Sequence, residues 1–121
     1  MSMHSTEHAE QIVLKCLDES KDGIVVLPTG MPWKALLVPS DAYYVVFPSP
    51  RGGYNAQAIP VAVDSQQCKK PFPEEWRGKR ESLSEISGIE GMIFCHSHGY
   101  LLAADTLEAA VAACEKSMQG K

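Results

Sequence analysis

The chain has 121 residues, a length that suits one domain with its own hydrophobic core and is short for two. Apolar residues make up 45% of the chain and charged residues 21%, a balance typical of a soluble globular protein and not of a disordered one. The formal net charge of −4 argues against a nucleic-acid-binding surface, which needs clustered Lys and Arg to neutralise phosphates.

The four cysteines form no CxxC pair, and three of them lie in apolar patterns. We therefore expect buried, reduced thiols in an intracellular protein. The N-terminal segment lacks the apolar core of a signal peptide, and no apolar run is long enough to span a membrane. These features predict a cytoplasmic protein without membrane contact. The cysteines are Cys16, Cys68, Cys95 and Cys114.

The N-terminal third predicts a helix followed by a strand. Apolar residues at helical spacing between positions 9 and 17 predict a helix with one buried stripe, capped by Ser5 or Thr6 and ending at Asp22-Gly23. The continuous β-branched run at 23–27 predicts a buried strand. Pro32 is well placed to start a short helical turn that runs to residue 37.

The middle of the chain predicts a hairpin. Residues 42–47 and 54–63 have strand patterns, and the Pro-, Gly- and Ser-rich segment 48–53 between them predicts a loop that joins antiparallel strands. Pro60 would interrupt a central ladder, so we place it near an edge or a bulge. Residues 64–73 have no regular pattern.

The C-terminal half predicts alternating helices and strands. One turn is expected at 74–77, and Ser82 can cap a short helix that ends at Gly88. Strands are predicted at 92–96 and 100–103. Asp105 with Glu108 fits a capping box, and apolar residues then trace a helix to the C-terminus. Together these elements predict one α/β (α+β) domain over residues 1–121, with a mixed β-sheet of about five strands and the N- and C-terminal helices packed on it.

His96 and His98 are the first candidates for chemistry, because an apolar run leads directly into them. Buried strands in α/β proteins deliver polar side chains to sites at their carboxyl ends. If the strand continues, both imidazoles share one face, and a His-x-His pair can give a metal two ligands. A catalytic zinc needs three protein ligands and a structural zinc four, and no further His or Cys pair completes the set. We expect no metal and no cofactor.

Nucleophilic catalysis by Cys95, with a neighbouring histidine as base, is the other chemistry to weigh. Cys95 belongs to the apolar run and would face away from both histidines, and buried apolar thiols are inert because burial raises their pKa. Ser97 has the same geometry, and the Gly-x-Ser-x-Gly motif is absent. The dinucleotide fingerprint and the Walker pattern are also absent. We expect no catalytic residue.

Several short motifs between about residues 24 and 111 form a recognisable pattern. They are Pro32-Trp33-Lys34, Gln57-Ala58-Ile59-Pro60-Val61, Phe72-Pro73-Glu74-Glu75-Trp76-Arg77-Gly78, Leu83-Ser84-Glu85-Ile86-Ser87-Gly88-Ile89-Glu90-Gly91, and Phe94 with His96, Gly99 and Tyr100. This pattern resembles the C-terminal part of the melanocyte-proliferating-gene family, which belongs to the metal-dependent DHH phosphoesterase superfamily of hydrolases and exonucleases.

The resemblance implies an accessory, substrate-side domain. In that family the metal-binding Asp and His motifs lie in an N-terminal domain, which this sequence does not contain. The family's Gly-Gly-Asn-Lys-Thr segment corresponds here to residues 102–106, where the glycine pair is lost and the lysine becomes Asp105. Asn55 and Lys69 stand where the family has arginines, His96 is retained, and His98 replaces a serine.

We therefore expect a non-catalytic binding or interaction module derived from a phosphoesterase accessory domain. Its partner would be an unknown small ligand, another protein, or a second copy in a homodimer. The alternative is a metal-dependent hydrolase of the phosphodiesterase type, or a subunit of one. Nucleic-acid binding through the basic residues at 69–80 is the least favoured, because of the acidic total. The expected ligand-binding residues are His96, His98, Trp76, Arg77 and Lys69.

Overall fold

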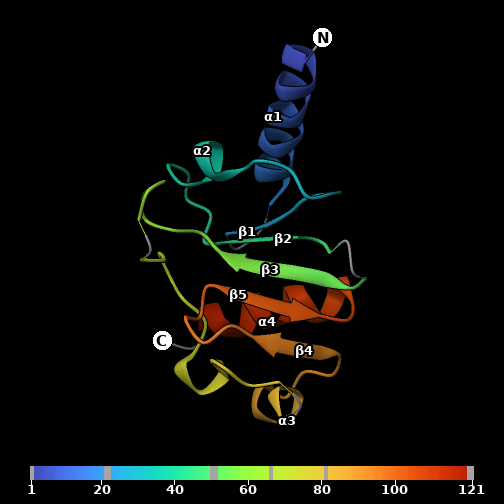
Figure 1. The fold of residues 1–121 in the computed structure, drawn as a ribbon, viewed down its shortest axis with the longest axis vertical. Helices are drawn as coiled ribbons and strands as arrows, with labels where there is room; N and C mark the ends of the chain where they lie inside the picture. The colour runs from blue at the N-terminus through green and yellow to red at the C-terminus, as the bar shows by residue number, and fades with distance from the viewer. Residues whose placement is uncertain (1, 21–22, 50–51, 66, 81, 120–121) are drawn as a thin grey trace.

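The computed structural model describes residues 2–20, 23–49, 52–65, 67–80 and 82–119, the first eight of them by backbone path alone. Its centre is a five-stranded mixed sheet with the order β1-β2-β3-β5-β4 (Figure 1). The elements are α1 (Ser2–Glu19), β1 (Ile24–Val26), α2 (Lys34–Leu37), β2 (Tyr44–Pro48), β3 (Tyr54–Ala58), the 3₁₀ turn η1 (Glu74–Trp76), α3 (Leu83–Ser87), β4 (Met92–Cys95), β5 (Leu101–Ala104) and α4 (Leu107–Gln119).

The sheet is parallel at one edge and antiparallel elsewhere. β1 runs parallel to β2, whereas the β2–β3, β3–β5 and β4–β5 pairs are antiparallel. The predicted hairpin is therefore present as β2 and β3, although β3 ends at Ala58 and not at residue 63. Pro60 lies just beyond that end, in an isolated bridge to Cys68, which spares the central ladder the loss of a donor. The predicted α+β fold, a mixed sheet of about five strands with N- and C-terminal helices, is confirmed.

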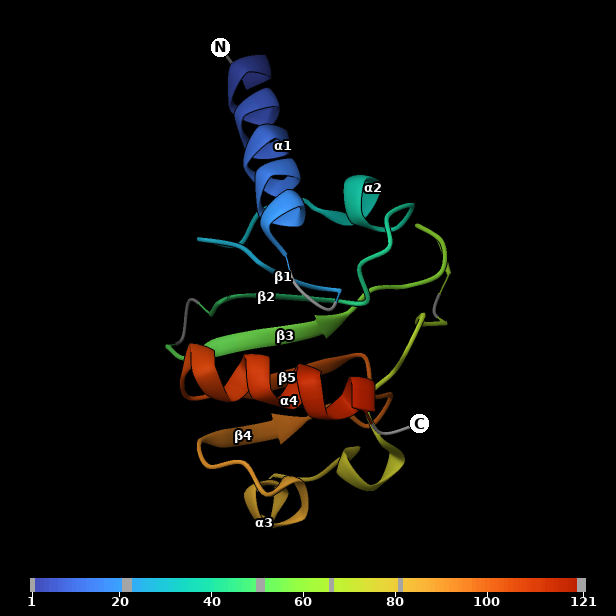
Figure 2. The same ribbon diagram turned by 180° about the vertical axis from the view of Figure 1, so that it is seen from behind.

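Two apolar clusters fill the two faces of the sheet. The strand alternation directs Ile24 and Tyr44 toward α4, and Val25 and Val45 toward α1 and α2. Helix α4 lies against the back of the sheet, where it contacts β1, β2, β3 and β5, while α1 and α2 cover only the β1–β2 end of the front (Figures 1 and 2). None of the described helices covers the front of β3, β5 and β4 (Figure 1).

Three helix starts differ from the sequence predictions. Helix α1 begins at Ser2, before the predicted cap at Ser5 or Thr6. The cap of α4 is Thr106 and not Asp105, because the Ala109 amide donates to Thr106 Oγ1 at 3.1 Å. Ser82 precedes α3, but its side chain makes no capping hydrogen bond. Helix α3 ends as predicted at Gly88, whose φ of 74° is the left-handed conformation that terminates many helices. The predicted stop of the first helix includes Asp22, which lies outside the described residues.

Of the four free cysteines, Cys95 and Cys114 are buried, whereas Cys16 and Cys68 are half-buried. The expectation of buried thiols is met fully by the first two and only partly by the others. None of the described helices is both long enough and apolar enough to cross a membrane.

Candidate functional site

The two histidines lie in the tight turn that joins β4 to β5. Strand β4 ends at Cys95, one residue earlier than predicted, and the His96 carbonyl accepts the Gly99 amide at 2.9 Å. The His96 amide donates to the Leu101 carbonyl at 2.8 Å and closes the hairpin. Gly99 has a φ of 73°, a conformation that glycine adopts without strain, and this allows the turn to be so short.

The turn brings the two imidazoles together. Their ring centroids are 5.1 Å apart, and the His96 ring is also 4.7 Å from that of Tyr100. The His98 amide donates to His96 Nδ1 at 3.1 Å, so the ring proton of a neutral His96 lies on Nε2. The expectation that both rings lie on one side holds, but through this turn and not through the alternation of a continuing strand.

A cavity of about 460 Å³ opens beside this turn. It lies where the C-terminal end of β3, the start of α2 and the segment after β3 meet the β4–β5 turn. His98 is exposed at its border and Tyr100 is half-buried in its wall. The described lining residues are Lys34, Gln57, Ala58, Pro60, Ser65, Cys68, His98 and Tyr100.

Backbone hydrogen bonds hold the walls of this cavity in place. The Ala58 amide donates to the Tyr100 carbonyl at 2.7 Å, which fixes the turn against β3. The segment after β3 closes on itself, since the Val61 amide donates to Gln67 at 2.9 Å and the Lys69 amide donates to Ile59 at 2.9 Å. The β4–β5 turn, the segment after β3 and the C-terminal end of β3 thus form the boundary of the cavity.

The cavity has a cationic and hydrogen-bonding lining. Lys34 is exposed, and its ammonium has no hydrogen bond or ion pair among the described residues. Gln57, Ser65 and Tyr100 add an amide and two hydroxyls. The described part of the lining contains no Asp or Glu. Such a set of groups favours an anion, because the described lining contains one lysine and no carboxylate.

Arg77 supports the turn from below and does not line the cavity. Its Nε donates to the Phe72 carbonyl at 3.1 Å, and the Phe72 amide donates to the Gly99 carbonyl at 2.9 Å. A Cβ added at Gly99 would lie 2.5 Å from the same Nε, so the guanidinium passes directly beneath the turn. The structure therefore brings Arg77 next to the predicted histidines as a support of their backbone.

Trp76 lies in the core. Its side chain is 2% exposed, and its ring stacks on Phe72 with centroids 6.3 Å apart. Phe72 in turn stacks on Tyr44 at 5.1 Å, so three aromatic rings link η1 to the centre of the sheet. The placement agrees with a packed anchor, and contact between Trp76 and a ligand stays a prediction.

Lys69 is not among the residues that line the cavity, and it stabilises a loop. Its ammonium donates to the carbonyls of Leu37, Ser40 and Ala42, with distances of 3.5 Å to the first and 3.0 Å to the last. Burial lowers the pKa of Lys69, an effect that the Asp41 carboxylate opposes. The charge thus satisfies backbone acceptors between α2 and β2.

We expect Lys69→Met to lower the free energy of unfolding by about 1–2 kcal/mol, because three carbonyls lose a charged donor while the aliphatic stem is kept. Urea denaturation measures the loss, and Lys70→Met is the control at the neighbouring, half-buried lysine. Equal midpoints for the two variants would contradict the structural role.

The residues at the turn do not fit a complete metal centre. His96 and His98 offer two nitrogens, and no group of three or more His, Cys, Asp or Glu side chains is gathered for a metal among the residues whose side chains are described. A catalytic zinc takes three protein ligands. The side chains of His4 and His8 lie outside the described part of the chain.

Cys95 is buried within the cluster that contacts α4 and is not among the residues that line the cavity. Burial raises the pKa of Cys95 to about 11, against a smaller lowering by Arg77. A thiol with such a pKa is almost entirely protonated at neutral pH and is a poor nucleophile.

Comparisons with known proteins place this chain in a family. The family model described as "Uncharacterised protein family (UPF0160)", that of MYG1 exonuclease, matches residues 1–118. The chain belongs to the MYG1 family. This is the melanocyte-proliferating-gene family that the sequence motifs resemble.

The relatives are much longer than the matched region. The MYG1 protein of Dictyostelium discoideum is 34% identical over 108 residues, which are 82% of this chain and 33% of the relative. The human MYG1 exonuclease is 32% identical over 104 residues, or 78% of this chain and 28% of the relative. The chain spans about a third of the length of the curated relatives it matches. No solved structure shows a significant match.

Sequence reasoning missed Lys34 and Gln57 as site residues. Both occur in the motifs that carry the resemblance to the MYG1 family, the Pro-Trp-Lys turn and the Gln-Ala strand, and both line the cavity with His98 and Tyr100. The signal that could have identified these residues is that separate family motifs meet at one cavity. This meeting can be recognised only once the fold is known.

Proposed function

We propose that this chain is a non-catalytic binding module and that it holds a small anionic ligand in the cavity beside the His96–Gly99 turn. The observation that carries the proposal is the convergence of Lys34, Gln57 and His98 on one open cavity of about 460 Å³. Cavities of this size suit small molecules, and a few convergent polar groups in them fix a ligand's orientation.

The charge of the cavity supports an anion as the ligand. Lys34 supplies a full positive charge with no carboxylate beside it in the described lining, although the whole chain has a net charge of −4. A lysine in a hollow with no ion pair among the described residues attracts anions locally, even in a protein of negative net charge. The Gln57 amide, the His98 imidazole and the hydroxyls of Ser65 and Tyr100 can each donate a hydrogen bond to an oxyanion.

The arrangement of groups favours binding over catalysis. The described lining has no Asp or Glu to serve as general base, and the cavity thiol, Cys68, has its pKa raised by burial. His96 Nδ1 already accepts the His98 amide, which ties up one of its two nitrogens. Charged and neutral donors that surround a hollow can hold an oxyanion without reacting with it.

Titration of the protein with inorganic phosphate or acetate, followed by amide and imidazole NMR shifts, tests the proposal. We expect saturable shifts at His98, Tyr100 and residues of α2. Lys34→Met should weaken binding at least about tenfold, since a charged hydrogen bond contributes about 1.5–3 kcal/mol. Lys79→Met, at another exposed lysine that does not line the cavity, should leave binding unchanged.

Three outcomes would overturn the proposal: no saturable shifts with either anion, shifts centred elsewhere, or equal losses in the two lysine variants. His98→Ala provides a second check, because it removes one cavity donor but keeps the amide that bonds His96. It should weaken binding severalfold without changing the urea midpoint.

A second candidate, part of a metal-dependent hydrolase, is favoured by the names of relatives such as the human and mouse MYG1 exonucleases. The match covers only about a third of those relatives, so their activity does not transfer by itself. Elemental analysis after gentle purification discriminates: stoichiometric zinc or manganese, with chelator-sensitive phosphodiesterase activity, supports the hydrolase and contradicts the binding module.

A further inference from the structure

A second hollow adjoins the cavity and has a different character. It measures about 400 Å³ and lies along the turn before α2. Apolar side chains from that turn and Val63 from the facing loop form most of its wall. Its lining residues are Met31, Pro32, Trp33, Lys34, Ala35, Gln57 and Val63.

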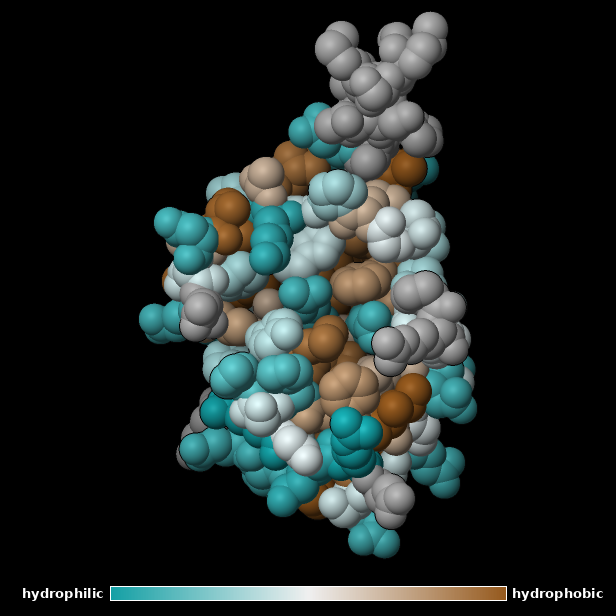
Figure 3. All heavy atoms as spheres, viewed as in Figure 1, coloured by the Kyte–Doolittle hydropathy of each residue, from teal (hydrophilic) through white to brown (hydrophobic). Residues whose placement is uncertain are grey.

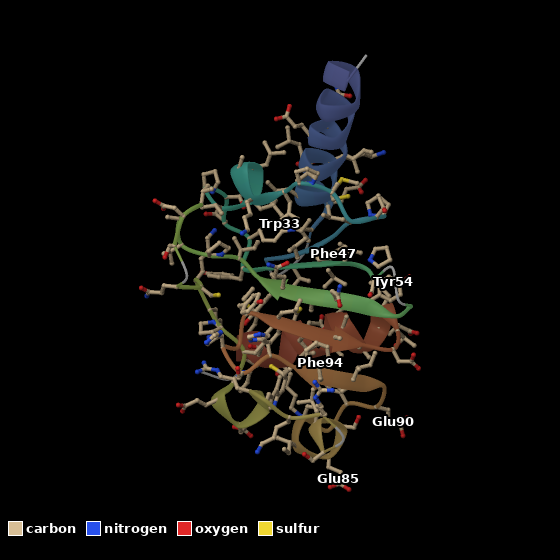
Figure 4. All side chains as sticks on the ribbon, in the orientation of Figure 1. Trp33, Phe47, Tyr54, Glu85, Glu90 and Phe94 are labelled. Atoms are coloured by element: carbon tan, nitrogen blue, oxygen red, sulfur yellow. The ribbon has the colours of Figure 1, made fainter. Side chains whose placement is uncertain are left out.

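Lys34 and Gln57 line both hollows, so the two spaces meet at these side chains. On one side are the polar groups of the cavity, and on the other side is the apolar groove. Trp33 is 6% exposed and lies between α2 and the sheet (Figure 4), where it forms part of the wall of the groove. Hydrophobic residues reach the surface next to hydrophilic ones over this face (Figure 3).

Val63 is the exposed wall of the groove. Its side chain is 57% exposed, the highest value among the exposed large hydrophobic residues of the described chain. An apolar side chain in that position gains free energy when another apolar surface covers it. The groove therefore offers an apolar contact to a molecule whose charged end is held at Lys34.

From the junction of the two hollows we infer that the ligand is an amphipathic organic anion: an oxyanion head group in the cavity and an apolar alkyl or aryl part in the groove of Met31, Pro32 and Val63. The inference rests on the proposed function, since the head group occupies the same site. Lys34 would contact the head group from the border between the two parts.

Matched pairs of ligands with and without the apolar part test this inference. Inorganic phosphate is compared with hexyl phosphate, acetate with hexanoate, and 1-hexanol serves as the apolar part alone. Removal of two methylene groups from water is sufficient for about a tenfold gain in affinity. We expect hexyl phosphate or hexanoate to bind at least about tenfold more tightly than its bare head group. Whichever of hexyl phosphate and hexanoate binds more tightly identifies the preferred head group, phosphate or carboxylate.

Variants of Val63 separate the two parts of the site. Val63→Ser should reduce the affinity for the long-chain anion severalfold and leave the affinity for the bare anion unchanged. Val61→Ser is the matched control, because Val61 is 47% exposed on the same loop but lines neither hollow. Lys34→Met should weaken both members of a pair.

The outcomes distinguish the two proposals. Binding of bare anions at His98 with no gain from the alkyl chain overturns the amphipathic ligand and leaves the anion site intact. A gain that is equally lost in the Val61 and Val63 variants also overturns it. No binding by any of the anions overturns both proposals, and tight binding of 1-hexanol alone contradicts the requirement for a charged head group.

Discussion

Replacement of Phe72 by alanine is expected to lower the free energy of unfolding by about 3–5 kcal/mol. The ring is fully buried and lies between Tyr44 and Trp76, with centroid distances of 5.1 and 6.3 Å. Its loss leaves a cavity between η1 and the sheet, and the flanking rings of Tyr44 and Trp76 cannot easily move to fill it. Because a domain of this size has about 5–15 kcal/mol of stability in total, the variant should be close to unfolding.

Urea denaturation followed by tryptophan fluorescence measures the loss, since Trp76 contacts the replaced ring. Phe72→Leu is the control that keeps most of the apolar volume, and it should cost about 1–2 kcal/mol. A loss below about 1 kcal/mol in the alanine variant would contradict the packing of η1 on the sheet. A loss of equal size in both variants would show that ring stacking, and not volume, holds η1 there.

The sequence predicts most helices and strands because their signals are local. The β-branched run of β1, the helical spacing of α1 and α4 and the Gly88 stop of α3 are each contained in a short window. The pairing order depends on contacts between distant segments. β5 lies between β3 and β4, and β1 joins β2 after a crossover, arrangements that no local pattern specifies.

Sequence reasoning points to the β4–β5 turn but not to most of the residues that line the cavity beside it, and ligand binding there stays a prediction. The apolar run into His96 and His98 identifies the end of β4, and the turn there borders the cavity. Lys34 and Gln57 are 23 positions apart, and the crossover that follows β1 brings them together. For Lys69, ligand binding stays a prediction, and the fold supplies acceptors for its ammonium from Ser40 and Ala42.

The core and the site are continuous in this protein. Phe72 stacks on Trp76, its carbonyl accepts Arg77 Nε, and its amide donates to Gly99 in the histidine turn. Residues predicted to contact a ligand, Trp76 and Arg77, thus hold the turn from the inside. The supports of the turn thus lie inside the fold, whereas His98 is exposed.

Gly99→Ala should lower the free energy of unfolding by about 2–3 kcal/mol. Gly99 has a φ of 73°, where an alanine costs about 1–2 kcal/mol. The added Cβ would also lie 2.5 Å from Arg77 Nε, so the guanidinium must move and lose its hydrogen bond to Phe72. That loss adds about 1 kcal/mol. Urea denaturation measures the sum, and the imidazole NMR signals of the turn should shift with it.

Two further variants separate the backbone cost from the steric cost. Gly78 has a φ of 75°, and a Cβ there would meet nothing nearer than Ser97 Cβ at 4.0 Å. Gly78→Ala should therefore show the backbone cost alone. In an Arg77→Ala background, where the obstructing side chain is absent, Gly99→Ala should cost no more than Gly78→Ala. If Gly99→Ala cost the same with and without Arg77, the guanidinium would not lie beneath the turn, and its role as the support of His96 and His98 would be wrong.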